Sequence, residues 1–446
     1  MNKNWTIMMR FSNAGLWLPM AFAATSLIFS GCSENSPEDY IEPPFEDDGI
    51  ILRETLFENL PGSEIPYRIP AFATYGDGTV IAIGDYRYGK GDIGSGRIDL
   101  HYRISRDNGL TWGPERVLVE GDGQTGATCA FGDAAIVSDS ETDETLLITV
   151  CGSTGYLAGT RENPCRVAEF RSYDKGETWT EMKDITESIY SIFDDCASQT
   201  FKSCFIASGK IMQSRIIKKG SHYRLYAAII ARPGGNKVIF SDDFGKTWAA
   251  LGGPDAQPSP NGNEAKCEEL PDGRVVLSSR VLGGRLFNIF TYSDIQTGAG
   301  SWDSEEFSSA KNDGCAAETN NGTNGEILIL PAVEKATNKN CHIALQSVPL
   351  GPRRSNVAIY VKKLDPETSD ITSESFAGSW TEAYRVSDTQ SAYSTMDVQS
   401  NGRIGIFLEE KLNQAGNGYD LVYTSVPLDS LTLDMYRLRR AALFGK

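Results

Sequence analysis

The chain has 446 residues, a formal net charge of −17, 40% hydrophobic residues and 10% aromatic residues. This length exceeds that of an ordinary single domain, so either one large repeat fold or two ordinary domains would account for it. The excess of acidic residues argues against nucleic acid as a partner, because no basic stripe offsets it.

The first 31 residues have the composition of an export signal and contain no acidic side chain. Two basic residues, Lys3 and Arg10, precede an apolar stretch at residues 16–29. The run Ile28-Phe29-Ser30-Gly31-Cys32 predicts a lipobox, in which Cys32 becomes the lipidated N-terminus of an exported protein anchored to the membrane of the cell envelope. An ordinary cleaved signal and a signal anchor are the alternatives.

Beyond the signal, the chain divides into a tether and one large domain. Residues 32–50 are acidic and contain prolines, which predicts a flexible tether. Residues 51–446 carry 44 − 3 = 41 of the 44 glycines, and they are rich in Asp, Asn and Ser. This composition favours a domain of short strands and many turns.

Strand-like runs begin at residue 52 and continue almost to the end of the chain. Residues 98–104 alternate strictly between apolar and polar side chains, which is typical of a strand with one buried face. Short helices are expected only at 185–193 and 431–443. The further predicted strands are 146–150, 223–230, 237–240, 274–278, 286–292, 326–330, 356–361, 404–408 and 420–426.

The pattern S-x-D-x-G-x-T-W occurs three times, at residues 105–112, 172–179 and 241–248. Its aspartates are 174 − 107 = 67 and 243 − 174 = 69 residues apart, and a degenerate fourth copy occupies 293–302. A fixed period indicates one repeated structural unit. With units of this length, the chain holds roughly six, which predicts an all-β fold: a six-bladed β-propeller of four-stranded antiparallel sheets. The repeated pattern itself is interpreted as a turn that builds the scaffold.

The chain has nine cysteines and three histidines. An exported chain permits disulfides, and Cys196 and Cys204 are the closest pair, but spacing alone does not fix the connectivity. No C-x-x-C pair occurs, so a zinc site or a Ser-His-Asp triad has little support. We expect no required metal and no cofactor.

The repeated turns resemble the Asp boxes of sialidases, and a second motif makes the resemblance specific. Tyr67-Arg68-Ile69-Pro70 is similar to the F/Y-R-I-P motif of that family, and Gly84-Asp85-Tyr86-Arg87 and Gly91-Asp92-Ile93-Gly94 follow it before the first box. From about residue 52 to the C-terminus, the order of motifs resembles bacterial exo-α-sialidases. The resemblance implies a six-bladed propeller with its site at the central axis, on the face away from the boxes.

The resemblance also implies three arginines that clamp the carboxylate of the substrate. Arg68 matches the first of them. Arg280 matches the second, with Arg285 as its rival, and Arg354 matches the third, with Arg353 as its rival.

The reacting groups that the resemblance implies are a tyrosine and two carboxyl groups. Tyr393 matches the nucleophile, Glu264 its base, and Asp92 the acid and base that serves the leaving group and water. The other matched positions are Glu409, or its rival Glu410, which would hold the first arginine, and two substrate-binding positions, Asp133 and Arg87.

These matches imply a retaining exo-α-sialidase that removes terminal sialic acid from glycoproteins, glycolipids and oligosaccharides through a covalent tyrosyl intermediate. Residues 51–446 would then be the catalytic domain. The alternatives are a propeller that binds sialylated glycans without cleaving them, and a trans-sialidase or intramolecular trans-sialidase.

Overall fold

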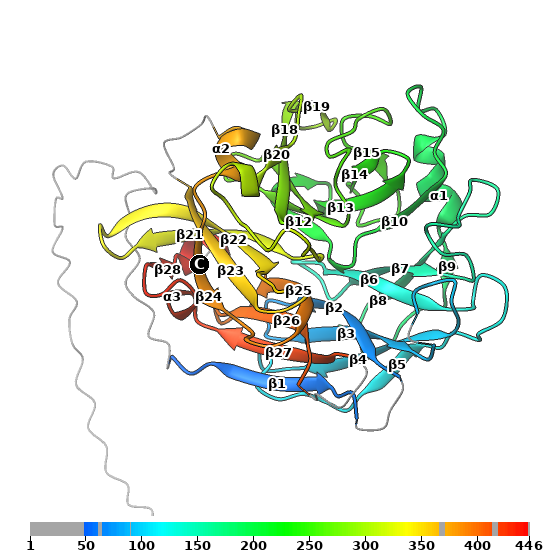
Figure 1. The fold of residues 1–446 in the computed structure, drawn as a ribbon, viewed down its shortest axis with the longest axis horizontal. Helices are drawn as coiled ribbons and strands as arrows, with labels where there is room; N and C mark the ends of the chain where they lie inside the picture. The colour runs from blue at the N-terminus through cyan, green and yellow to red at the C-terminus, as the bar shows by residue number, and fades with distance from the viewer. Residues whose placement is uncertain (1–48, 61–64, 90, 365–370, 413–417, 445–446) are drawn as a thin grey trace, which may run out of the picture. The chain divides into compact units, whose positions relative to one another are not determined.

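The computed structural model describes residues 49–60, 65–89, 91–364, 371–412 and 418–444. The predicted signal and most of the predicted tether therefore lie outside the described residues. Within them, six small sheets follow one another along the chain (Figure 1), and the predicted six-bladed β-propeller is confirmed.

The first three sheets come from residues 67–250. The first contains β2 (Tyr67–Thr74), β3 (Val80–Arg87), β4 (Ile98–Ser105) and β5 (Arg116–Val119). The second contains β6 (Phe131–Ser138), β7 (Thr145–Cys151), β8 (Arg166–Ser172), β9 (Lys183–Asp184) and β11 (Gly209–Lys210). The third contains β10 (Ser203–Ile206), β12 (Met212–Lys219), β13 (His222–Arg232), β14 (Gly235–Ser241) and β15 (Ala249–Ala250).

The other three sheets use the rest of the chain and its first strand. The fourth contains β16 (Ala265–Glu269), β17 (Val275–Val281), β18 (Gly284–Asp294), β19 (Ala299–Trp302) and β20 (Phe307–Ser308). The fifth contains β21 (Ile327–Glu334), β22 (Lys339–Pro349), β23 (Val357–Leu364), β24 (Thr381–Arg385) and β28 (Tyr436–Leu438). The sixth contains β25 (Ser391–Val398), β26 (Ile404–Glu410), β27 (Asp420–Val426) and β1 (Leu52–Phe57).

Two sheets have the predicted four strands, and four sheets have five. Some of the additional strands arise because two short segments share the length of one long strand. β10 and β12 pair with opposite ends of β13, and β19 and β20 do the same with β18. Strand pairs are antiparallel except for β11, which lies parallel to β6.

Helices are few and short in the described residues. They are α1 (Thr186–Tyr190), α2 (Ser373–Ala377), α3 (Leu428–Leu431), α4 (Arg440–Phe444) and two 3₁₀ turns, Ser191–Phe193 and Ser309–Lys311. The predicted helix at 185–193 is confirmed as α1 with the 3₁₀ turn that follows it. The predicted helix at 431–443 is wrong, because β28 interrupts it by pairing with β21, where Tyr436 is buried.

The ring of sheets is closed by strands from opposite ends of the chain. β1 pairs antiparallel with β27 and so becomes the outer strand of the last sheet (Figure 1). Leu56 and Phe57 of β1 are buried with Phe72, Phe407 and Tyr423. Burial of this apolar surface stabilises the closed ring.

The repeated turns have one geometry. In each, the serine hydroxyl donates to the aspartate at 2.8 Å and accepts from the glycine N–H at 2.8 Å. The aspartate also accepts from the N–H and the hydroxyl of the threonine, as in Asp107 with Thr111 at 2.8 and 2.6 Å. These bonds confirm that the pattern forms a turn.

The turns mark one edge of the sheets, and the first strands begin at the other. Each turn follows the third strand of its sheet, β4, β8 or β14. Because adjacent strands in these sheets are antiparallel, the third strand ends at the edge opposite to the start of the first strand. Residues at the start of the inner strands therefore lie away from the turns, as the resemblance implied.

The eight cysteines in the described residues are free thiols. Cys204 is fully buried in β10, whereas Cys196 is partly exposed and its thiol donates to Asp255. The closest pair in the sequence is therefore not paired in the structure.

Candidate active site

Three inner strands have a β-bulge at the edge away from the repeated turns. The register shifts between Arg68 and Ala71 in β2, between Gly132 and Ala135 in β6, and between Ser391 and Ser394 in β25. A bulge bends a strand and redirects its side chains, and bulges are common beside active sites. These three bulges carry Arg68, Asp133 and Tyr393.

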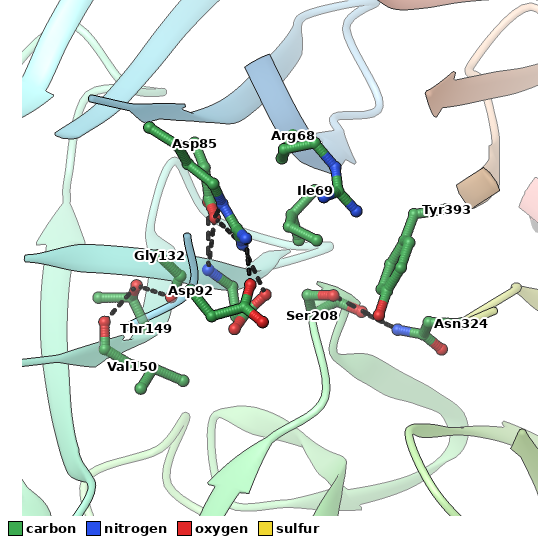
Figure 2. Close-up of polar contacts among 12 residues, drawn as sticks. Arg68, Ile69, Asp85, Asp92, Gly132, Thr149, Val150, Ser208, Asn324 and Tyr393 are labelled. Carbon is green, nitrogen blue, oxygen red and sulfur yellow. Dashed lines mark hydrogen bonds and ion pairs between the residues drawn. The ribbon is translucent and has the colours of Figure 1, made fainter. Parts of the chain in front are cut away.

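The bulges leave backbone groups that cannot join the ladder, and buried side chains pair with them. Ile69, at a φ of 56°, donates its N–H to Glu409 at 2.9 Å, and Tyr393 donates its N–H to the same carboxylate at 3.3 Å. Asp133, at a φ of 53°, donates its N–H to Asp85 at 3.1 Å. The Thr149 hydroxyl donates to the carbonyl of Gly132 at 2.5 Å (Figure 2).

Glu409 also holds the first arginine. The Arg68 Nε donates to Glu409 Oε1 at 2.6 Å, and Glu409 is fully buried. Glu410, the rival, accepts instead from Ser387 at 2.6 Å and pairs with Arg53. The structure therefore brings Glu409, and not Glu410, to Arg68.

Tyr393 and Glu264 form a direct pair. The Tyr393 hydroxyl lies 2.8 Å from both carboxylate oxygens of Glu264, which precedes β16. Arg280, near the end of β17, pairs with Glu264 and also donates to the Tyr393 hydroxyl at 3.0 Å. Burial, together with the charge of Glu264, raises the pKa of Tyr393 well above that of an ordinary tyrosine, so the phenol is neutral.

Three arginines surround the ring of Tyr393. The guanidinium carbons of Arg68, Arg280 and Arg354 lie 5.8, 5.9 and 5.6 Å from its centroid. Figure 2 shows Arg68 and Tyr393 extending from their strands toward a common space, with Asp92 across from them in this view. The arrangement offers three cations to one anionic group.

The two rival arginines have other surroundings. Arg353 is exposed, whereas Arg354 next to it is partly buried against Tyr393. Arg285 is buried and donates to the Ser278 carbonyl at 2.8 Å and the Thr323 carbonyl at 3.1 Å. Burial lowers the pKa of Arg285 to about 10, and its contacts join β17 to the loop that contains Thr323.

A second cluster contains three aspartates around one buried arginine. Arg87 Nη2 donates to Asp85 at 2.7 Å and lies 3.5 Å from Asp133, and Arg87 Nη1 pairs with Asp92 (Figure 2). Arg87 is 2% exposed and Asp92 82% exposed. The carboxylate of Asp92 is therefore exposed to solvent, while the arginine with which it pairs is buried.

Asp85, which is buried, and Asp133, which is partly buried, hold their protons more tightly than an ordinary aspartate. Burial raises the pKa of Asp133 to about 8 against the opposing effect of Arg87, and Asp85 and Glu264 add to the rise. Burial also raises the pKa of Asp85 to about 6, although Arg87 opposes it. Arg87 carries one positive charge, whereas the three aspartates would carry three negative charges if all were ionised. A proton kept on one aspartate lowers this repulsion.

Some residues near the site carry no signal in the sequence. Asn324 donates to the carbonyl of Ser208 at 2.9 Å, and Figure 2 draws this contact near the hydroxyl of Tyr393. Lys266, two residues after Glu264, is buried and donates to the same carbonyl. Only the alternation of side chains along the strand after Glu264 could have indicated that Lys266 shares its face.

The described residues contain neither a metal-binding cluster nor a helix that could span a membrane. No group of three or more His, Cys, Asp or Glu side chains there is arranged to hold a metal ion. No helix in the same residues has the length and apolar character needed to span a membrane.

Comparison with known proteins shows what the chain resembles. Residues 89–406 match the family of BNR repeat-like domains. Over 223 residues the chain is 30% identical to a sialidase from Micromonospora viridifaciens and 30% identical to a sialidase from Paraclostridium sordellii, in each case over 48% of this chain. The matches cover 32% and 52% of those two proteins, so the chain spans about half of their length or less.

Solved structures share the fold. The intramolecular trans-sialidase from Ruminococcus gnavus superposes with a TM-score of 0.64 at 16% identity, covering 85% of this chain and 98% of the other. The Trypanosoma rangeli sialidase in complex with sialic acid has a TM-score of 0.60 at 16% identity, covering 84% and 58%.

Asp133→Asn should change how stability depends on pH. Asp133 keeps its proton when folded and loses it when unfolded, so its stabilising effect is present below about pH 4 and is lost as the pH rises through about 8. Between pH 5 and pH 8.5, wild type should lose about 4 kcal/mol more of its unfolding free energy than the variant does, at about 1.4 kcal/mol for each pH unit between 5 and 8. Urea denaturation at both pH values measures this. The control Asp143→Asn, at an exposed carboxylate, should keep the wild-type slope; equal slopes for all three proteins would contradict the assignment.

Proposed function

The chain belongs to the family of BNR repeat-like domains, and we propose that it is a retaining exo-α-sialidase that removes terminal sialic acid from glycans. One observation carries the proposal: the Tyr393 hydroxyl lies 2.8 Å from Glu264, inside a ring of three arginines. Similarity to two bacterial sialidases supports the same class of substrate.

The arginines suit the carboxylate of sialic acid. A guanidinium stays charged and binds a carboxylate through two parallel hydrogen bonds. Arg68, Arg280 and Arg354 would orient the sugar with its anomeric carbon above Tyr393. They also create a local positive field in a chain of net charge −17, which otherwise repels an anionic sugar.

The substrate explains why the attacking group is a phenol. The anomeric carbon of sialic acid carries a carboxylate, so an attacking carboxylate would meet a like charge at a few ångström. At an effective dielectric constant of about 20 that repulsion costs about 4 kcal/mol. A neutral tyrosine avoids this cost, and sialidases differ in this from most glycosidases. Because a phenol is a weak nucleophile at neutral pH, it needs the base that Glu264 supplies.

The reaction proceeds in two displacements. The Tyr393 oxygen bonds to the anomeric carbon and gives its proton to Glu264, while the bond to the glycan oxygen breaks and that oxygen takes a proton from Asp92. Water then gives a proton to Asp92 and attacks the same carbon, and the released phenolate takes the proton back from Glu264. Two inversions leave the product in its original α configuration.

Asp92 would carry out the proton transfers, and Arg87 would hold it in place. Asp92 is exposed, so it can reach both the leaving oxygen and water, and the pair with Arg87 holds its loop near the site. Arg87 and Asp133 lie beside Asp92 and would contact the sugar or fix its neighbours. Glu409 would fix Arg68.

The reaction product shows which group attacks the covalent intermediate. In a hydrolase water attacks the intermediate, in a trans-sialidase another sugar does so, and in an intramolecular trans-sialidase a hydroxyl of the same sialic acid does so. The chain shares its fold with an intramolecular trans-sialidase and with a sialidase. ¹H NMR of the reaction should show free α-sialic acid as the first product. An anhydro sugar as the first product would instead indicate an intramolecular trans-sialidase, and a sialylated acceptor sugar would indicate a trans-sialidase. A propeller that binds without cleaving would give no product.

We also propose that residues 1–31 direct export and that Cys32 carries a lipid anchor, on the composition of that segment. In a bacterial host fed an alkynyl fatty acid, wild type should be labelled and Cys32→Ser should not. An unlabelled wild type would leave an ordinary cleaved signal or a signal anchor.

Tyr393→Phe should lower kcat on a fluorogenic sialoside by at least about 100-fold, because the nucleophile is lost. Glu264→Gln should lower it by about 10²–10⁴-fold, because the base is lost. The control Tyr226→Phe removes the hydroxyl of a buried tyrosine in the third sheet, which bonds to Tyr292 of the fourth sheet, and it should stay within about twofold of wild type. Full activity of Tyr393→Phe would refute the mechanism.

Adjacent arginines give a second test. Arg354→Ala should lower kcat/KM by about 10- to 100-fold, because a charged hydrogen bond to the substrate carboxylate is lost. Arg353→Ala removes the same charge one residue away, at an exposed side chain, and should stay within about twofold. Steady-state kinetics on the same sialoside compares them, and equal losses would show that only the long-range field matters.

A further inference from the structure

The loop that carries Asp92 rests on a neighbouring loop of the second sheet. Asp92 lies between β3 and β4, and residues 152–165 join β7 to β8, so both loops lie at the edge of the sheets that carries the site. The carboxylate of Asp92 is exposed and lies across from Arg68 and Tyr393 in the view of Figure 2. Whatever supports this loop therefore sets the position of the proposed acid and base.

The two loops meet backbone to backbone at Gly94 and Gly155. A Cβ atom on Gly94 would lie 2.6 Å from the nitrogen of Gly155. A Cβ atom on Gly155 would lie 2.5 Å from the carbonyl oxygen of Ile93 and 4.0 Å from the Cα of Gly94. An ordinary contact between a carbon and a carbonyl oxygen is about 3.3–3.6 Å. Neither glycine has room for a side chain, so the backbone of one loop supports the backbone of the other.

Ile93 fastens the Asp92 loop beside this contact. Its side chain is buried in an apolar cluster with Val150 of β7 and Phe205 of β10, and Tyr156 of the neighbouring loop packs against the same cluster. Burial of this apolar surface holds the loop down. Because Asp92 directly precedes Ile93, a shift of the Ile93 carbonyl also shifts Asp92.

The loop between β7 and β8 is the firmer of the two. The carbonyl of Gly155 accepts from the N–H groups of Ala158 and Gly159 at 3.1 and 2.9 Å, which closes a tight turn. The ring of Tyr156 packs edge-on against the ring of Phe205, with 5.2 Å between the centroids. This loop is therefore held by its own turn and by an aromatic contact with β10.

The Asp92 loop has fewer ties. The N–H of Ser95 donates to the carbonyl of Asp92 at 3.0 Å, and the carboxylate of Asp92 pairs with Arg87. No hydrogen bond joins the backbone of residues 91–96 to another described part of the chain. An atom added to Gly155 would therefore displace the Asp92 loop and not the loop to which Gly155 belongs.

We propose that Gly155 is a positioning residue of the reaction. Because it has no side chain, its loop supports the Asp92 loop at backbone distance and holds the Asp92 carboxyl where it serves the leaving oxygen. The inference rests on the proposed function for the role of Asp92. Gly155 acts through the backbone of Ile93 and Gly94, and not by contact with the reacting groups.

Gly155→Ala tests the inference. The φ of Gly155 lies outside the left-handed region, so alanine can adopt its backbone, and the new methyl group meets the Ile93 carbonyl. Relief of that 2.5 Å contact needs a shift of roughly 0.8 Å. The matched control is Gly89→Ala, also outside the left-handed region, where the new Cβ would lie 3.5 Å from the Ser95 carbonyl oxygen. Both variants place one methyl group against a carbonyl of the Asp92 loop, but only Gly155→Ala forces that loop to move.

The leaving group separates a positioning role from a merely structural one. A sugar oxygen needs the proton of Asp92 to leave, whereas nitrophenolate leaves as a stable anion. In Gly155→Ala, kcat/KM on sialyllactose should fall by about 100-fold, the effect of a misplacement of about 1 Å, and kcat/KM on p-nitrophenyl sialoside should stay within about threefold. Gly89→Ala should stay within about twofold on both substrates. Equal losses of Gly155→Ala on the two substrates, or no loss on either, would overturn the inference.

A second readout does not need activity. Crystal structures of wild type, Gly155→Ala and Gly89→Ala in one crystal form should show the backbone of Asp92 and Ile93 shifted by roughly 0.8 Å in Gly155→Ala and in place in Gly89→Ala. If wild type cleaves no sialoside and this shift occurs, the proposed function fails while Gly155 still sets the position of Asp92. If the loop between β7 and β8 moves instead and Asp92 keeps its place, the inference is overturned.

Ile93→Val tests the same support if Gly155→Ala does not fold. It removes one methyl group from the buried anchor and leaves both backbones unobstructed, a change that cores tolerate. The loss of kcat/KM on sialyllactose should exceed the loss on p-nitrophenyl sialoside by about threefold or more, because the loosened loop misplaces the same carboxyl. Equal effects on the two substrates would overturn the inference as well.

Discussion

A buried carboxylate that accepts backbone N–H groups is the interaction on which this site depends. Glu409 accepts from Ile69 and Tyr393, each released from its ladder by a bulge, and binds Arg68 at the same time. One side chain of β26 thereby fixes two strands and an arginine. A buried N–H without a partner would cost about 1–3 kcal/mol, so each bulge requires such an acceptor. Asp85 meets the same need for Asp133.

The charges of the site fall into two groups with different balances. Around Tyr393, three arginines face two buried carboxylates, Glu264 and Glu409, which leaves a positive excess for an anion. Around Arg87, three aspartates share one cation, which leaves a negative excess and a retained proton. The group with the positive excess and the group with the negative excess therefore lie beside each other in one acidic protein.

The sequence was enough to predict the scaffold but not the fine placement of the site. The repeated turns predict the propeller because each Asp bonds within its own turn. Residues 98–104 predict β4 because strict alternation is the period of a strand, but both faces of β4 are buried, with Asp99 and His101 on the polar face. Arg280 could not be separated from Arg285, or Glu409 from Glu410, because the contacts that decide between them, Arg280 with Tyr393 and Glu409 with Ile69, join residues more than 100 positions apart. The helix predicted at 431–443 failed for the same reason, since β28 needs the edge of β21. Lys266 is recognisable only once Glu326 and Ser208 are known to surround it.

The strand that closes the ring has a consequence for how the protein is made. Among the strands of the described residues β1 leaves the ribosome first, yet Leu52 pairs with Ser425, which is 425 − 52 = 373 residues later. At translation rates of about 5–20 residues per second, that interval is roughly 20–75 seconds. During it, Leu56 and Phe57 have no partner strand, and the nascent chain carries an apolar end in water. The last sheet can be completed only when β1 pairs with β27, and such long-range pairing is slow because the loop between the strands must close first.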